Sequence, residues 1–137
     1  MSGIVVDASI ALSWCFPDEQ TPLSIKILDM LKAGEPAVVP SFWCVEVLNT
    51  LLMGEKRGRI KPEQTEAFLG DLRTLAPLLD FASFEQVCGV VQKLSREHRL
   101  TPYDALYLEL ALRSGCRLAT LDQAQREAAA ALGIECL

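Results

Sequence analysis

Along the chain, short apolar runs alternate with segments whose apolar residues recur at helical spacing. The first run, Ile4-Val5-Val6, is β-branched and ends at Asp7, which is typical of a strand buried on both faces. Ser83 followed by Gln86 resembles a capping box at a helix start. Strands are expected at 4–6, 37–39, 78–81, 117–121 and 134–136, and helices at 22–32, 41 to about 56, 62–75, 83 to about 98, 101–115 and 123–132.

This alternation predicts a parallel sheet of about five short strands with helices on both faces, which is a three-layer α/β/α fold. The 137 residues fit a single domain, 1–137, because no repeat, low-complexity segment or linker divides them. No stretch of ~20 apolar residues is free of charge and proline, so we expect no membrane span. The N-terminal sequence also lacks the pattern of a secretory signal, and we expect a cytoplasmic protein.

Cysteine usage and net charge narrow the candidate chemistry. The five cysteines include no CxxC pair and each has apolar neighbours, so we expect small buried side chains in a reducing compartment and no zinc site. The formal net charge of −5 argues against a generally basic nucleic-acid-binding surface. That objection weakens if several of the acids bind divalent cations, because the site then attracts anions.

Four acids lie in apolar elements, where an unpaired carboxylate is unfavourable: Asp7, Glu46, Asp104 and Asp122. Each has a structural alternative. Asp7 and Asp122 would serve as N-caps of the helices that follow them, and Asp104 lies three residues after Thr101, as in a capping box. Capping does not explain Glu46, whose alternative is an exposed polar stripe on its helix.

A common metal site explains the four acids together. Asp7 and Asp122 follow predicted strands, and ligands of open parallel sheets bind at the carboxyl ends of the strands, near the point where strand order reverses. Asp104 lies in the first turn of a helix that can face the same edge, and Glu46 shares a helix face with Asn49. Four gathered carboxylates repel one another unless a cation neutralises them, and oxygen ligands favour Mg²⁺ or Mn²⁺ over zinc.

Three polar residues near these acids are candidates for accessory hydrogen bonds: Ser9, Asn49 and Thr120. Ordinary turn or helix-end hydrogen bonds explain them equally well. Asp18 and Glu19 are more simply a solvated loop than outer ligands. Basic residues that could contact phosphates are Lys56, Arg57, Arg59 and Arg113.

The sequence lacks the residues that other classes of enzyme require. The single histidine, His98, ends a polar helix, and no Ser-His or Cys-His pair can be built from it. There is no GxGxxG and no phosphate loop ending in GK[ST]. Tyr103 and Tyr107 indicate core or groove lining rather than a platform for stacking bases. A phosphotransferase or receiver domain is disfavoured because the DAS motif lacks a second Asp two residues after Asp7.

The chain resembles the PIN domain, and within it the VapC toxins of bacterial toxin–antitoxin pairs. The resemblance covers essentially the whole chain and is carried by VVDASIALSWCFPDE, PSFWCVEVLNTLL and LTPYDALYLELALRSGCRLATLDQ in that order. It implies a doubly wound α/β fold and an endoribonuclease dependent on Mg²⁺ or Mn²⁺, with its four acids at Asp7, Glu46, Asp104 and Asp122. It also implies a homodimer and inhibition by a small antitoxin protein.

The hypothesis is therefore hydrolysis of an RNA phosphodiester by water that one or two bound cations activate. Asp7, Asp104 and Asp122 would hold the cations, and Glu46 would complete the cluster or position the water. The alternative is a non-catalytic PIN-like module that binds RNA or protein, for which a missing acid would be the signature. None of the four is missing.

Overall fold

Four short parallel strands form the centre of the protein. A computed structural model describes residues 3–137, and its sheet has the order β3-β2-β1-β4. The strands are β1 (Ile4–Val6), β2 (Ala37–Pro40), β3 (Leu78–Asp80) and β4 (Arg117–Ala119). β1 and β2 are buried along their whole length, as their apolar runs predict, whereas the edge strand β3 is mostly exposed.

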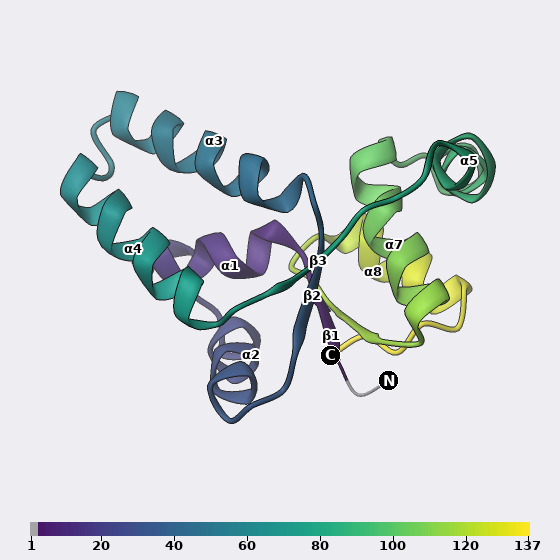
Figure 1. Cartoon of the computed structure of the whole chain (residues 1–137), viewed down its shortest axis with the longest axis horizontal. Helices are drawn as coiled ribbons and strands as arrows, with labels where there is room; N and C mark the ends of the chain where they lie inside the picture. The colour runs from purple at the N-terminus through teal and green to yellow at the C-terminus, as the bar shows by residue number, and fades with distance from the viewer. Residues whose placement is uncertain (1–2) are drawn as a thin grey trace.

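Helices cover both faces of this sheet. In chain order the helical segments are α1 (Ala8–Cys15), the 3-10 turn η1 (Pro17–Glu19), α2 (Pro22–Lys32), α3 (Trp43–Lys56), α4 (Pro62–Thr74), α5 (Phe84–Gln86), the π-helical η2 (Val87–Val91), α6 (Gln92–His98), α7 (Pro102–Ser114) and α8 (Gln123–Ala131). Helices α1 to α4 lie on one side of the strands and α5, α7 and α8 on the other (Figure 1). The predicted three-layer α/β/α class is confirmed.

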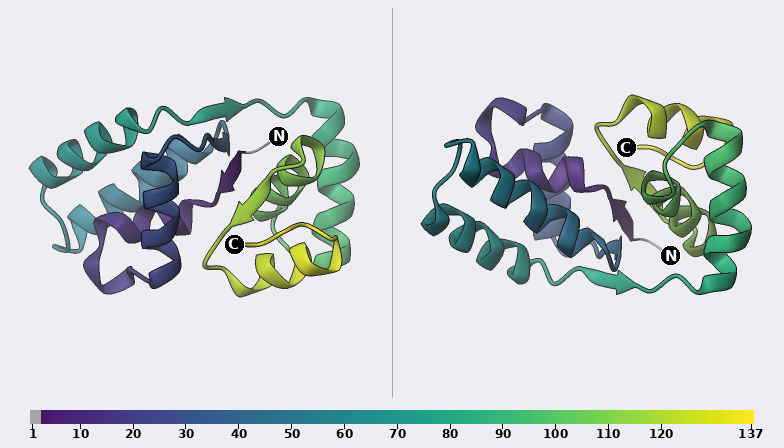
Figure 2. Two further views of the ribbon diagram at one scale, coloured as in Figure 1. Left: turned by 90° about the horizontal axis from the view of Figure 1, so that it is seen from below. Right: turned by 90° about the horizontal axis from the view of Figure 1, so that it is seen from above.

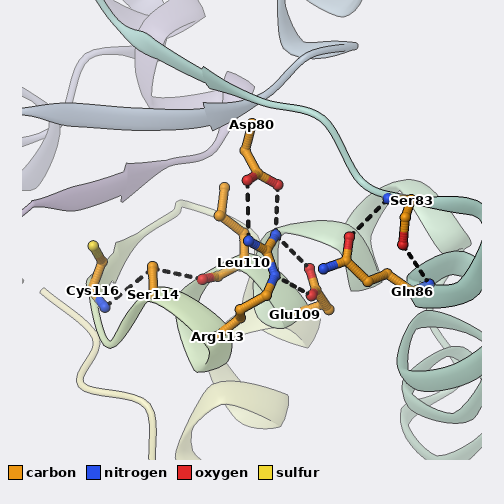
Figure 3. A network of polar contacts seen from close by, with 8 residues as sticks. All are labelled: Asp80, Ser83, Gln86, Glu109, Leu110, Arg113, Ser114 and Cys116. Atoms are coloured by element: carbon orange, nitrogen blue, oxygen red, sulfur yellow. Dashed lines mark hydrogen bonds and ion pairs between the residues drawn. The ribbon is translucent and has the colours of Figure 1, made fainter.

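The local start and stop signals explain most helix boundaries. Thr21 caps α2 through the amide of Ser24, and Ser83 with Gln86 forms the expected capping box (Figure 3). Helix α7 begins after Thr101, with Pro102 in its first turn, and ends at Gly115, whose φ of 70° suits a residue without a Cβ. Asp7 caps helix α1, as the structural alternative for this acid predicted.

Two expected elements differ from the structure. The fifth strand, 134–136, is reduced to an isolated parallel bridge between Leu118 and Cys136, so the sheet has four strands. The helix expected from 83 to about 98 is divided by η2, and this valine-rich stretch around Gly89 has weak intrinsic helix propensity. The spacing of hydrophobic residues over a single turn cannot distinguish an α-helix from a π-helix.

The order of the strands determines where a site can form. The chain passes from β1 to β2 to β3 in one direction and then returns to place β4 on the other side of β1. The strand order therefore reverses between β1 and β4, which lie side by side (Figure 2). The carboxyl ends of these two strands lead into Asp7 and Thr120. Fully buried side chains such as Ile10, Leu51 and Leu118 fill the core. Within residues 3–137 no helix has the length and apolarity needed to cross a membrane.

Candidate metal centre

The fold brings the four predicted acids together from four helices. Asp7 and Asp122 are the N-caps of α1 and α8, while Glu46 and Asp104 lie in the first turns of α3 and α7. The carboxylate of Asp104 repels those of Asp7 and Asp122, and Glu46 repels Asp7 and Asp104. The capping role and membership of the cluster are compatible, because a cap uses only one carboxylate oxygen.

Asp7 is the most enclosed of the four, with 6% of its surface exposed. Its Oδ2 accepts hydrogen bonds from the Ser9 hydroxyl at 2.5 Å, the Thr120 hydroxyl at 3.0 Å and the Ser9 amide at 3.3 Å. These hydroxyls are themselves held, because Ser9 accepts from the amide of Leu121 and Thr120 accepts from the amide of Asp122. Two of the accessory candidates thus orient one oxygen of Asp7.

Glu46 is half-buried and is held by a residue of the opposite helix layer. The Tyr107 hydroxyl donates to Glu46 Oε1 at 2.7 Å, and the Tyr107 ring is completely buried. Phe42 packs edge-on against Tyr107 with 5.6 Å between ring centroids. Asn49 is exposed on α3, and within residues 3–137 no hydrogen bond joins it to any of the four acids.

Gln125 joins the other two acids. Its side-chain Nε2 donates to Asp104 Oδ1 at 3.2 Å, and its main-chain amide donates to Asp122 Oδ1 at 2.8 Å. Gln125 lies in the first turn of α8 and is completely buried. One residue therefore contacts carboxylates on two different helices.

Three of the four carboxylates use one oxygen for these hydrogen bonds and leave the other one available. Within residues 3–137 the oxygens without a hydrogen-bond donor are Asp7 Oδ1, Glu46 Oε2 and Asp122 Oδ2, whereas Asp104 has a further hydrogen bond with the Thr101 side chain. None of them is among the buried unpaired atoms, so each remains open to solvent. The pattern suits acids that bind a ligand from outside the protein.

Electrostatics set these acids apart from ordinary surface carboxylates. Burial raises the pKa of Asp7, Glu46 and Asp104 above the usual values, and repulsion between the acids raises each further. Hydrogen bonds from Ser9, Tyr107 and Gln125 oppose that rise but do not cancel it. No ion pair within residues 3–137 includes any of the four acids.

The donor set fits a hard divalent cation. Carboxylate oxygens and water are the ligands that Mg²⁺ and Mn²⁺ prefer, and uncompensated repulsion between acids favours binding of a positive charge. In the described part of the chain, however, no group of three or more His, Cys, Asp or Glu side chains is arranged so that it could hold a metal ion as it stands. The acids gather within electrostatic range of one another without forming a closed cage.

Several other candidates lie in ion pairs elsewhere. Asp18 and Glu19 pair with Arg59, whose guanidinium also lies over the Phe16 ring at 4.3 Å. Arg113 pairs with Asp80 and Glu109 (Figure 3). Lys56 and Arg57 remain exposed at the end of α3.

Tyr107 and Gln125 were not predicted as site residues. A signal existed for Tyr107, since a tyrosine in an apolar helix needs a partner for its hydroxyl. For Gln125, the spacing of three residues after Asp122 predicts a capping box, in which the glutamine side chain would return to the main chain of Asp122. In the structure that side chain contacts Asp104 instead, which no local pattern indicates.

Comparisons with known proteins agree with this fold. The family model described as PIN domain matches residues 4–131. A curated relative, Ribonuclease VapC3 of Pyrobaculum aerophilum, is 27% identical over 120 residues, covering 88% of this chain and 89% of the relative. The crystal structure of PAE2754 from the same organism superposes with a TM-score of 0.70 at 20% identity, covering 93% of this chain and 84% of that one. A toxin–antitoxin complex from Klebsiella pneumoniae gives a TM-score of 0.58 at 16% identity, with coverage of 88% and 87%.

Proposed function

The chain belongs to the PIN domain family, and on that premise we propose that it is a divalent-metal-dependent endoribonuclease that acts as the toxin of a toxin–antitoxin pair. Family membership and the relative named as a VapC ribonuclease support a nuclease. The metal dependence and the residue roles rest on the geometry of the candidate metal centre.

One observation carries the proposal: four acids gather at the switch point of the sheet, and no basic side chain of the described chain pairs with them. Asp7, Glu46 and Asp104 have raised pKa values, and carboxylates without a protein counter-charge are unfavourable for stability. Binding of Mg²⁺ or Mn²⁺ would supply the missing charge. Helix capping by Asp7 and Asp122 does not supply it.

The chain's own residues have distinct tasks in the proposed reaction, which is hydrolysis of an RNA phosphodiester bond by water. Asp7, Asp104 and Asp122 would hold the cation, and Ser9 and Thr120 keep Asp7 in one orientation. A Mg²⁺ or Mn²⁺ ion held there would supply acidification of a water and neutralisation of charge at the phosphate. Glu46, fixed by Tyr107, completes the cluster or orients the attacking water. Exposed Lys56 and Arg57 are candidates for contacts with the RNA backbone.

We further propose that a small antitoxin binds this protein and that the protein forms a homodimer in the cytoplasm. The curated relative, named as a VapC ribonuclease, and the fold shared with the toxin–antitoxin complex from Klebsiella pneumoniae support an antitoxin partner. Exposed apolar side chains, among them Val45 and Leu52 on α3 and Phe81 and Phe84 beside β3, are of the kind that protein interfaces cover. The five cysteines are unpaired, in keeping with a reducing compartment, but the expectation that all are buried is wrong, since Cys44 and Cys88 are exposed.

The test is cleavage of a panel of RNAs by the purified protein with Mn²⁺ or Mg²⁺, with and without a chelator. We expect metal-dependent cleavage that the Asp7→Asn variant lacks while its circular dichroism spectrum is unchanged, because asparagine still caps α1. Equal cleavage by the wild type and Asp7→Asn would refute the proposal. RNA binding without cleavage, in protein shown to bind Mn²⁺, would favour the non-catalytic alternative.

A further inference from the structure

Gln125 is an unusual residue for the interior of this domain. It is completely buried in the first turn of α8, where the buried positions Ala128 and Ala129 follow it on the same helix. Its side-chain amide makes one hydrogen bond, from Nε2 to Asp104 Oδ1. The amide oxygen Oε1 is buried and has no hydrogen-bond partner within residues 3–137.

A half-satisfied buried amide is unfavourable for folding. An unpaired buried polar atom lowers the stability of the folded state, and a side chain such as leucine fills a similar volume without that penalty. Packing alone therefore does not account for glutamine at this position. The explanation has to come from the groups that its amide faces.

Two N–H groups of Gln125 donate to acids of the candidate metal centre. The side-chain Nε2 contacts Asp104, and the main-chain amide contacts Asp122. Exchanging the oxygen and nitrogen of the amide would bring two acceptors together at Asp104, so the contact with Asp104 fixes the orientation. Oε1 is shielded from solvent, so within residues 3–137 the contact of the Gln125 side chain with the site is the hydrogen bond from Nε2.

We propose that Gln125 is a positioning residue of the metal centre: its side-chain Nε2 holds the Asp104 carboxylate in the orientation in which that carboxylate would bind the cation. This inference rests on the proposed function, because it requires that a cation binds there. It assigns to α8 a role in metal binding beyond the cap provided by Asp122.

The proposal predicts a small effect on stability and a large effect on metal binding. Gln125→Leu removes the unpaired amide oxygen, which is favourable, and the donor to Asp104, which is unfavourable, so the melting temperature in chelator should change little. Mn²⁺ affinity measured by calorimetry falls about 10-fold to 100-fold, as for other residues that orient metal ligands. Gln125→Met, whose unbranched side chain adapts to the same space, serves as a second variant if leucine does not pack.

Gln123→Leu is the matched control. Gln123 is exposed in the same turn of α8, and its amide donates only to Glu127, so we expect wild-type Mn²⁺ affinity. If Gln125→Leu and Gln125→Met lose stability but bind Mn²⁺ like the wild type, Gln125 is structural and the inference is overturned. If the wild type neither binds Mn²⁺ nor cleaves RNA, the proposed function fails and the inference fails with it. Normal binding and cleavage by the wild type together with normal binding by both variants overturns the inference alone.

Discussion

Two clusters of acids in this protein are stabilised in different ways. In the first, Arg113 bridges Asp80 of β3 and Glu109 of α7, with Nη2 2.6 Å from Asp80 Oδ2 and Nε 2.7 Å from Glu109 Oε1. The neighbouring carboxylates raise the pKa of Arg113, so its charge is permanent. In the second, the candidate metal centre, the acids are contacted among residues 3–137 only by neutral hydroxyl and amide groups.

We interpret the difference as one between a structural cluster and the proposed metal site. An arginine neutralises buried acids within the fold and holds a strand against a helix without further ligands. Neutral donors orient carboxylates but leave their charge uncompensated, so the site stays available for a cation from solution. Substitutions within each of the two clusters test this view.

The largest effect is expected from a comparison of one acid of each cluster. Asp104→Asn removes a proposed cation ligand and should lower RNA cleavage about a thousandfold, which corresponds to about 4 kcal/mol. Asp80→Asn keeps a hydrogen-bond acceptor for Arg113 and should leave the cleavage rate per folded molecule within about twofold. Single-turnover rates with Mn²⁺ measure both. Similar losses in the two variants would show that the clusters do not differ in function.

Removal of the guanidinium should affect stability rather than activity. Arg113→Met leaves the almost fully buried Glu109 without its partner, and we expect the free energy of unfolding to fall by about 2 kcal/mol, reduced from the value for a fully buried pair because Arg113 is 37% exposed. Urea denaturation measures the change. Lys93→Met, which removes an exposed pair with Glu97, should change it by less than about 0.5 kcal/mol. A loss in Lys93→Met as large as in Arg113→Met would contradict the expectation.

Tyr107→Phe removes only the hydroxyl that orients Glu46. We expect Mn²⁺ affinity to fall about tenfold and stability to fall by about 1 kcal/mol, because one charged acceptor loses its donor. Tyr103→Phe is the control, since Tyr103 lies one turn earlier on α7 and is 60% exposed. Calorimetric titration with Mn²⁺ distinguishes them. If the tyrosine acts through Glu46, adding Tyr107→Phe to Glu46→Gln should lower Mn²⁺ affinity little beyond Glu46→Gln alone.

The smallest effect concerns stability without metal. Burial raises the pKa of Asp7, so between its ordinary and its raised pKa the folded state holds a proton that the unfolded state has lost. Stability therefore falls as pH rises through that interval. In chelator at pH 7 we expect Asp7→Asn to melt roughly 2–5 °C above the wild type, the shift that about 1 kcal/mol produces.

That difference should shrink as the pH is lowered toward the ordinary pKa of an aspartate, and excess Mn²⁺ should reverse it. Binding of the cation stabilises only the chain that holds it and displaces protons from the carboxylates. Differential scanning fluorimetry across pH, with chelator and with Mn²⁺, measures all of these shifts. A gap that widened on acidification would contradict the burial argument.

Much of the fold could be predicted because its signals are local. The β-branched run before Asp7, the Thr21 cap and the stop at Gly115 each act within a few residues, and the structure contains all three elements. The expected strand at 134–136 is reduced to one bridge with Leu118, because strand pairing depends on a partner that is distant in the sequence. Local propensity alone does not reveal how long such a pairing extends.

The α/β/α class and the four candidate acids could be predicted from the sequence, since acids within apolar elements stand out there. Which donor meets each acid depends on the tertiary fold. Thr120 reaches Asp7 across 113 residues, Tyr107 reaches Glu46 across 61, and Gln125 reaches Asp104 across 21. These contacts form only after the sheet has brought distant helix ends together, so no sequence period encodes them. The four acids were visible in the sequence, and the buried residues that orient them became visible in the folded chain.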